Sequence, residues 1–135
     1  MKRLNTFKGV VYPWYCDHMG HMNVQHYISK FDEATWNIFA HVGLTGRYMK
    51  ANNTGMVAVD QRIIYKLELL PGDNIFIESE ILDIENKKIH FKHFMYRLGT
   101  NEIVSETTML GVCIDTVTRK SKALPDFVLT YYKQD

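Results

Sequence analysis

The sequence contains no apolar run that approaches the roughly 20 residues a membrane-spanning helix needs. Its 135 residues include only two cysteines, Cys16 and Cys113, which are too few for a disulfide framework and suit a reducing compartment as free thiols. The formal net charge is +1, so no overall positive field points to nucleic acid or to an anionic membrane. No apolar signal segment follows the basic start, and we therefore expect a cytoplasmic protein.

The chain also lacks internal repeats, low-complexity tracts and linker-like stretches. With 46% hydrophobic residues, a chain of 135 residues has enough apolar material for one compact core. We therefore predict a single domain over residues 1–135.

One long helix is predicted from the spacing of apolar residues between Val24 and Val42, which recur every three or four positions along one face. Asn23 is a suitable N-cap, and Gly43 stands where a left-handed residue commonly ends a helix. A helix of this size is about 30 Å long, so it must cross the whole core.

The chain after residue 55 is rich in β-branched and aromatic residues and is divided by turn signals. The predicted strands are 56–69, 75–84, 89–98 and 102–115, with another at 8–15 and a closing segment at 124–132 that is helical after Pro125. Short connections favour antiparallel hairpins. The order of elements predicts an α+β hotdog fold, in which a curved antiparallel sheet of about five strands wraps the long helix. The sheet edge favours pairing with a second copy.

The densest polar cluster lies where the first predicted strand leads into the helix, from Tyr15 to Asn23. The first turn of a helix exposes unpaired N–H groups that can bind an oxyanion. A carboxylate just before it, such as Asp17, can attack a bound carbonyl or activate water against it. These two elements suffice for acyl transfer.

The run Asp17-x-x-Gly20-His21-x-Asn23-x-x-x-Tyr27 resembles the signature of the 4-hydroxybenzoyl-CoA thioesterase family of hotdog proteins. The resemblance extends over about residues 7–128. It implies hydrolysis of an acyl-CoA thioester without a metal or organic cofactor, in homodimers or homotetramers with active sites at subunit interfaces.

By this resemblance, Asp17 is the catalytic carboxylate, acting as nucleophile or general base, and the backbone N–H of Val24 is the oxyanion donor. Many members of the family have Asn where this chain has Val24, which bears on substrate choice more than on reaction type. His21 either orients Asp17, touches the substrate, or simply binds local backbone. Asn23 and Tyr27 are candidate substrate-binding residues, although capping and core packing explain them better.

Other candidates lie further along the chain. Asp60 interrupts an apolar stretch and either faces solvent or enters the pocket of a partner subunit. Lys87, Lys88 and Lys92 either bind the phosphates of CoA or occupy solvated turns.

Histidines and a cysteine cluster near Asp17, at Cys16, His18, His21 and His26, but no second Cys/His pair completes a zinc-binding pattern, so we predict no metal. Cys16 is the alternative nucleophile. Neighbouring side chains on an extended segment face opposite ways, so Cys16 and Asp17 cannot both address one substrate, and we prefer Asp17.

Two other functions use the same fold. A hotdog hydratase or dehydratase would employ Asp17 and His21 as an acid–base pair, but the spacing differs from the expected motif. A non-catalytic acyl-CoA-binding domain would have no need of Asp17. The sequence leaves the acyl group open, because Trp14, Tyr15, Trp36 and Phe39 suit aromatic, fatty or cationic groups.

Overall fold

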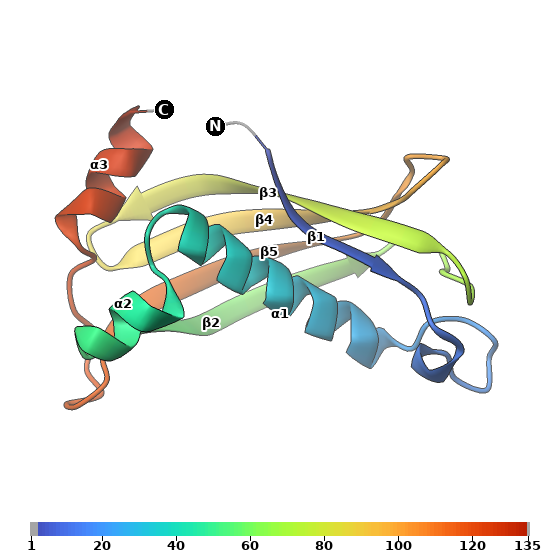
Figure 1. Cartoon of the computed structure of the whole chain (residues 1–135), viewed down its shortest axis with the longest axis horizontal. Coiled ribbons are helices and arrows are strands. Elements are labelled where there is room, and N and C mark those ends of the chain that lie inside the picture. The colour runs from blue at the N-terminus through green and yellow to red at the C-terminus, as the bar shows by residue number, and fades with distance from the viewer. Residues whose placement is uncertain (1–2, 135) are drawn as a thin grey trace.

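The computed structural model describes residues 3–134 (Figure 1). Its elements, in chain order, are β1 Leu4–Val10, the 3-10 helix η1 Pro13–Tyr15, α1 Val24–His41, α2 Gly46–Ala51, β2 Thr54–Tyr65, β3 Asn74–Glu85, β4 Lys88–Arg97, β5 Ile103–Asp115 and α3 Asp126–Gln134. The long helix, the last three strands and the helix after Pro125 are confirmed, whereas η1 and α2 were not predicted.

The strands form one five-stranded sheet in the order β1-β3-β4-β5-β2, and every neighbouring pair is antiparallel. α1 lies across one face of this curved sheet, with α2 and α3 at the end that its C-terminus reaches (Figure 1). The predicted α+β arrangement is thus confirmed. Hairpins join β3, β4 and β5, but β2 pairs with β5 rather than with β3.

Two strand predictions were wrong in their bounds. The strand expected at 8–15 ends at Val10, and Pro13 opens η1 instead, because proline has no N–H for a sheet ladder. The strand expected at 56–69 ends at Tyr65. The amides of Lys66 and Leu67 both donate to the Val104 carbonyl, and the chain then leaves that edge of the sheet for β3.

Both ends of α1 are as predicted. The side chain of Asn23 accepts a hydrogen bond from the Gln25 amide at 3.1 Å, which caps the first turn. Gly43, directly after the C-cap Val42, has a φ of +99°, a conformation that favours glycine. These signals fix an 18-residue helix, about 27 Å long.

The apolar core between α1 and the sheet contains a buried polar chain centred on His93, which the sequence did not reveal. His93 Nε2 lies 2.9 Å from the Thr35 hydroxyl of α1, and Nδ1 lies 2.5 Å from the Ser79 hydroxyl of β3. The Ser79 hydroxyl in turn lies 2.7 Å from the Thr6 hydroxyl of β1. Burial lowers the pKa of His93 to about 3, so its imidazole is neutral. One histidine thereby links the helix to the sheet.

Cys16 and Cys113 are free thiols, as predicted. Within residues 3–134, no helix has both the length and the apolar character that crossing a membrane requires.

Candidate active site

The loop before α1 folds back on itself as a small hairpin. Cys16 and Met22 form an isolated antiparallel bridge, and the Asp17 amide donates to the His21 carbonyl at 3.1 Å. Gly20 closes the turn: its amide donates to the Asp17 carbonyl, and its φ of +86° favours a residue without Cβ. The hairpin returns Asp17 to the start of the helix.

The Asp17 carboxylate accepts two hydrogen bonds and forms no ion pair with any residue in the range 3–134. Oδ2 accepts from Asn23 Nδ2 at 2.8 Å, and Oδ1 accepts from the Met19 amide at 2.8 Å. The Asn23 bond, followed by the Met19 bond, lowers the pKa of Asp17 below its ordinary 3.8. Asp17 is therefore ionised at neutral pH and held in place by neutral donors.

Asn23 connects this carboxylate to the helix. Its side-chain oxygen accepts a hydrogen bond from the Gln25 amide, while its side-chain nitrogen donates one to Asp17. One side-chain amide therefore caps the helix and also holds the Asp17 carboxylate, and we call this Asp17–Asn23 contact the clamp. The structure therefore places the predicted substrate-binding residue Asn23 between the carboxylate and the helix.

The first amide of α1, that of Val24, has no hydrogen-bond partner within the described part of the chain. A free N–H at a helix N-terminus carries part of the positive end of the helix dipole. An ionised carboxylate and an amide without a partner in residues 3–134 therefore flank Asn23.

A pocket of about 230 Å³ opens beside this helix start. Its walls include His21, Val24 and Tyr27 on the helix side, and Tyr65, Leu67 and Glu68 at the end of β2 and beyond it. Tyr27, besides lining this pocket, is 4% exposed and packs in the core. Asp17 does not line this pocket itself; His21, whose carbonyl binds the Asp17 amide, lies on its wall.

The sequence did not indicate the wall formed by residues 65–68. These residues were assigned to the end of a strand, and only the path of the chain from β2 to β3 places them opposite Tyr27.

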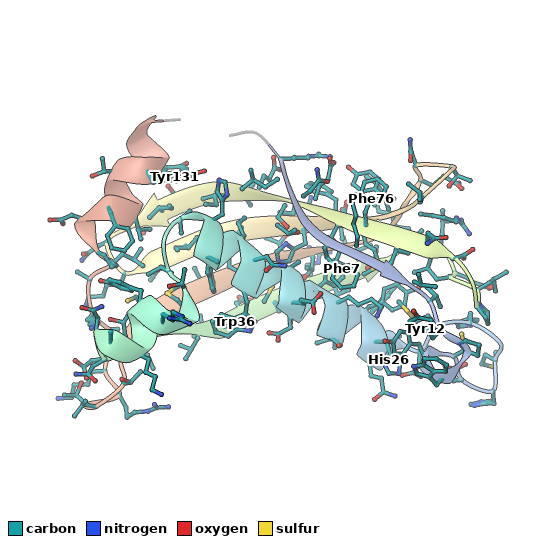
Figure 2. All side chains as sticks on the ribbon, in the orientation of Figure 1. Phe7, Tyr12, His26, Trp36, Phe76 and Tyr131 are labelled. Carbon is teal, nitrogen blue, oxygen red and sulfur yellow. The ribbon has the colours of Figure 1, made fainter. Side chains whose placement is uncertain are left out.

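Aromatic rings surround the other side of the loop, where Figure 2 shows Tyr12 and His26 at the same end of the molecule. Tyr15 packs against His26 with ring centroids 4.8 Å apart, and the Lys30 ammonium lies 4.0 Å from the Tyr15 ring centroid. Tyr12 and Trp14 stack at 4.6 Å. These contacts support the backbone that leads into Asp17.

The remaining predicted residues lie apart from this site within one chain. Asp60 is exposed at a β-bulge and borders a different hollow, together with Arg62 and His90. Lys87 and Lys88 lie at the β3–β4 turn, at the end of the molecule opposite the start of α1 (Figure 1). Lys92 Nζ lies 3.6 Å from Glu106, so CoA binding there would compete with an ion pair.

No group of three or more His, Cys, Asp or Glu residues within 3–134 is arranged to hold a metal ion. His26 packs on Tyr15, and the Cys16 thiol points toward the Tyr12 carbonyl.

Comparison with known proteins gives a consistent picture. The model of the thioesterase-like superfamily matches residues 11–130. The betainyl-CoA thioesterase of Pseudomonas aeruginosa is 25% identical over 114 residues, which cover 83% of this chain and 72% of that protein. The long-chain acyl-CoA thioesterase of Escherichia coli is 24% identical over 111 residues, or 82% of this chain and 83% of that protein.

Among solved structures, a Staphylococcus aureus protein determined in complex with CoA has a TM-score of 0.90. It is 20% identical, and the match covers 99% of this chain and 85% of that chain. This likeness confirms the predicted hotdog fold.

Proposed function

This chain belongs to the thioesterase-like superfamily, and from that premise we propose that it hydrolyses an acyl-CoA thioester to the free acid and CoA, with Asp17 as the reacting carboxylate. The predicted enzyme class, an acyl-CoA thioesterase, agrees with the relatives named above. The observation that carries the assignment of Asp17 is the arrangement around Asn23, which holds an ionised carboxylate next to a helix whose first amide has no partner in the described residues 3–134.

In the proposed reaction, the thioester oxygen accepts a hydrogen bond from the Val24 amide. Asp17 either removes a proton from water, so that hydroxide adds to the carbonyl carbon, or adds its own oxygen to that carbon. The Val24 amide and the helix dipole stabilise the oxyanion that forms in either case. The oxyanion then collapses as the C–S bond breaks, and CoA leaves as a thiolate that needs little acid assistance. This step gives the free acid on the general-base route, and on the nucleophilic route it gives an anhydride with Asp17 that water then opens.

The acyl group is proposed to enter the pocket lined by Val24, Tyr27 and Tyr65, where His21 adjoins both the pocket and the Asp17 loop. Its volume of about 230 Å³ is below the roughly 300–1,000 Å³ typical of pockets for drug-sized ligands, which favours a short acyl group.

The rest of CoA is proposed to depend on a second subunit. Lys87 and Lys88, in the β3–β4 turn, lie at the end of the molecule opposite the start of α1, so they would reach CoA bound at this site only from a partner. The free edge of β2 is exposed from Ala58 to Arg62 and is the proposed dimer edge. Asp60 lies on this edge and could then approach the partner's pocket.

A single domain and a cytoplasmic location remain predictions.

The decisive experiment measures thiol release from a panel of acyl-CoAs by the wild type, Asp17→Asn and the loop control His18→Gln. We expect Asp17→Asn to lose at least about 100-fold in kcat, because a positioned acid–base group contributes about 10²–10⁴-fold. His18→Gln should retain activity, because His18 is exposed and is not part of the clamp.

Equal rates for the wild type and Asp17→Asn would show that the carboxylate is wrongly assigned. Absence of thiol release from every acyl-CoA would contradict the proposed hydrolysis. Loss of an enoyl-CoA chromophore without free thiol would favour hydration instead.

A further inference from the structure

The pocket beside α1 presents two tyrosine rings to its contents. Tyr27 and Tyr65 meet edge to face, with ring centroids 5.1 Å apart and planes at 89°. Burial, followed by the influence of Tyr65 and Glu68, raises the pKa of Tyr27 to about 12, so its ring stays a neutral phenol. The faces of such rings are electron-rich and attract cations, quaternary ammonium groups above all.

The charges of the pocket wall add to this preference. Glu68 lines the pocket and is exposed, and it has no ion-pair partner within residues 3–134. The basic residue on the same wall, Lys66, has its ammonium 3.5 Å from Glu106, a carboxylate that also lies 3.6 Å from the Lys92 ammonium. The ionised Asp17 lies just beyond His21. A ligand in this pocket therefore meets aromatic rings and the Glu68 carboxylate, which has no ion-pair partner within residues 3–134.

Resting on the proposed function, we infer that this pocket selects short acyl groups that end in a positive charge, with a quaternary ammonium group as the preferred chemistry. Tyr27 and Tyr65 supply the ring surfaces, and Glu68 supplies the countercharge. An apolar acyl group of the same shape would fill the pocket but gain nothing from Glu68, whereas an anionic group would be repelled by it.

The test uses two thioesters of matched shape, trimethylammonioacetyl-CoA and 3,3-dimethylbutanoyl-CoA, which differ in one nitrogen and one charge. We expect kcat/KM to be at least tenfold higher for the charged thioester, mainly through a lower KM. Glu68→Gln and Tyr65→Leu should each reduce this ratio several-fold. Tyr65→Phe, which keeps the ring, should preserve the ratio.

Binding of both thioesters to Asp17→Asn, measured by calorimetry, separates the two proposals. Preferential binding of the charged thioester supports the inference even if no hydrolysis occurs, in which case the proposed function alone fails. Equal affinities, no detectable binding of either thioester, or a ratio that Glu68→Gln and Tyr65→Leu leave unchanged would overturn the inference, while hydrolysis of other acyl-CoAs would leave the proposed function standing.

Discussion

The substitution Val24→Pro offers a direct test of the oxyanion site, because it deletes one N–H group and little else. Val24 is the first residue of α1, a position at which proline is well accepted. Asn23 has φ −71° and ψ 147°, the extended conformation that a residue before proline prefers. The Val24 side chain is 54% exposed, so the proline ring replaces a side chain that packs little.

The expected magnitudes follow from the same geometry. The Val24 amide has no partner within residues 3–134, so its removal breaks no hydrogen bond of the folded chain. The free energy of unfolding should change by less than about 1 kcal/mol, which corresponds to a shift in Tm of no more than about 4 °C. The loss of one oxyanion donor, by contrast, typically lowers kcat about 10²–10³-fold.

The assay compares kcat and KM of Val24→Pro with those of Val24→Ala, which truncates the same side chain and keeps the amide. We expect Val24→Ala to retain kcat within a few-fold and Val24→Pro to lose it with KM little changed. A folded Val24→Pro that turns over as fast as Val24→Ala would refute the assignment of this amide to the oxyanion.

Three further predictions concern other parts of the molecule. Asn23→Ser keeps a helix cap but loses the donor that most lowers the pKa of Asp17. If Asp17 is the reacting carboxylate, the acid limb of kcat/KM should therefore move to higher pH at nearly unchanged Tm. Asn23→Ala should lose about 1 kcal/mol of stability as well, and identical pH profiles for Asn23→Ser and the wild type would contradict the role of the Asn23–Asp17 hydrogen bond. Since the pKa of His93 falls from 6.5 to about 3 on folding, the unfolded state binds one more proton in this window. Stability therefore falls on acidification by up to about 1.4 kcal/mol per pH unit, a slope that His93→Gln should lack in denaturant titrations at pH 7, 5.5 and 4. Gly43→Ala should lower Tm, because φ at this position is +99° and the new Cβ would lie 2.7 Å from the Phe127 ring. In the control Gly46→Ala, the new Cβ would meet nothing within 4 Å. Equal Tm values for the two variants would contradict this account.

The sequence by itself determined the elements whose signals are local. The apolar spacing after Val24, the cap at Asn23 and the glycine at 43 defined α1, because each acts within one or two turns of the same helix. Turn residues similarly separated β3, β4 and β5. The motif around Asp17 belongs to this class, since the residues that position the carboxylate, Met19 and Asn23, lie within six positions of it.

Only the tertiary structure decided which distant segments meet. The pairing of β2 with β5 is decided by the burial of one sheet face that both strands share. Strands that are far apart in the chain compete for this position, and no local sequence signal specifies which of them pairs. The same holds for His93, whose partners Ser79 and Thr35 lie 14 and 58 positions away. The wall that Tyr65 and Glu68 form opposite Tyr27 likewise arises because the chain leaves β2 past the start of α1 to reach β3.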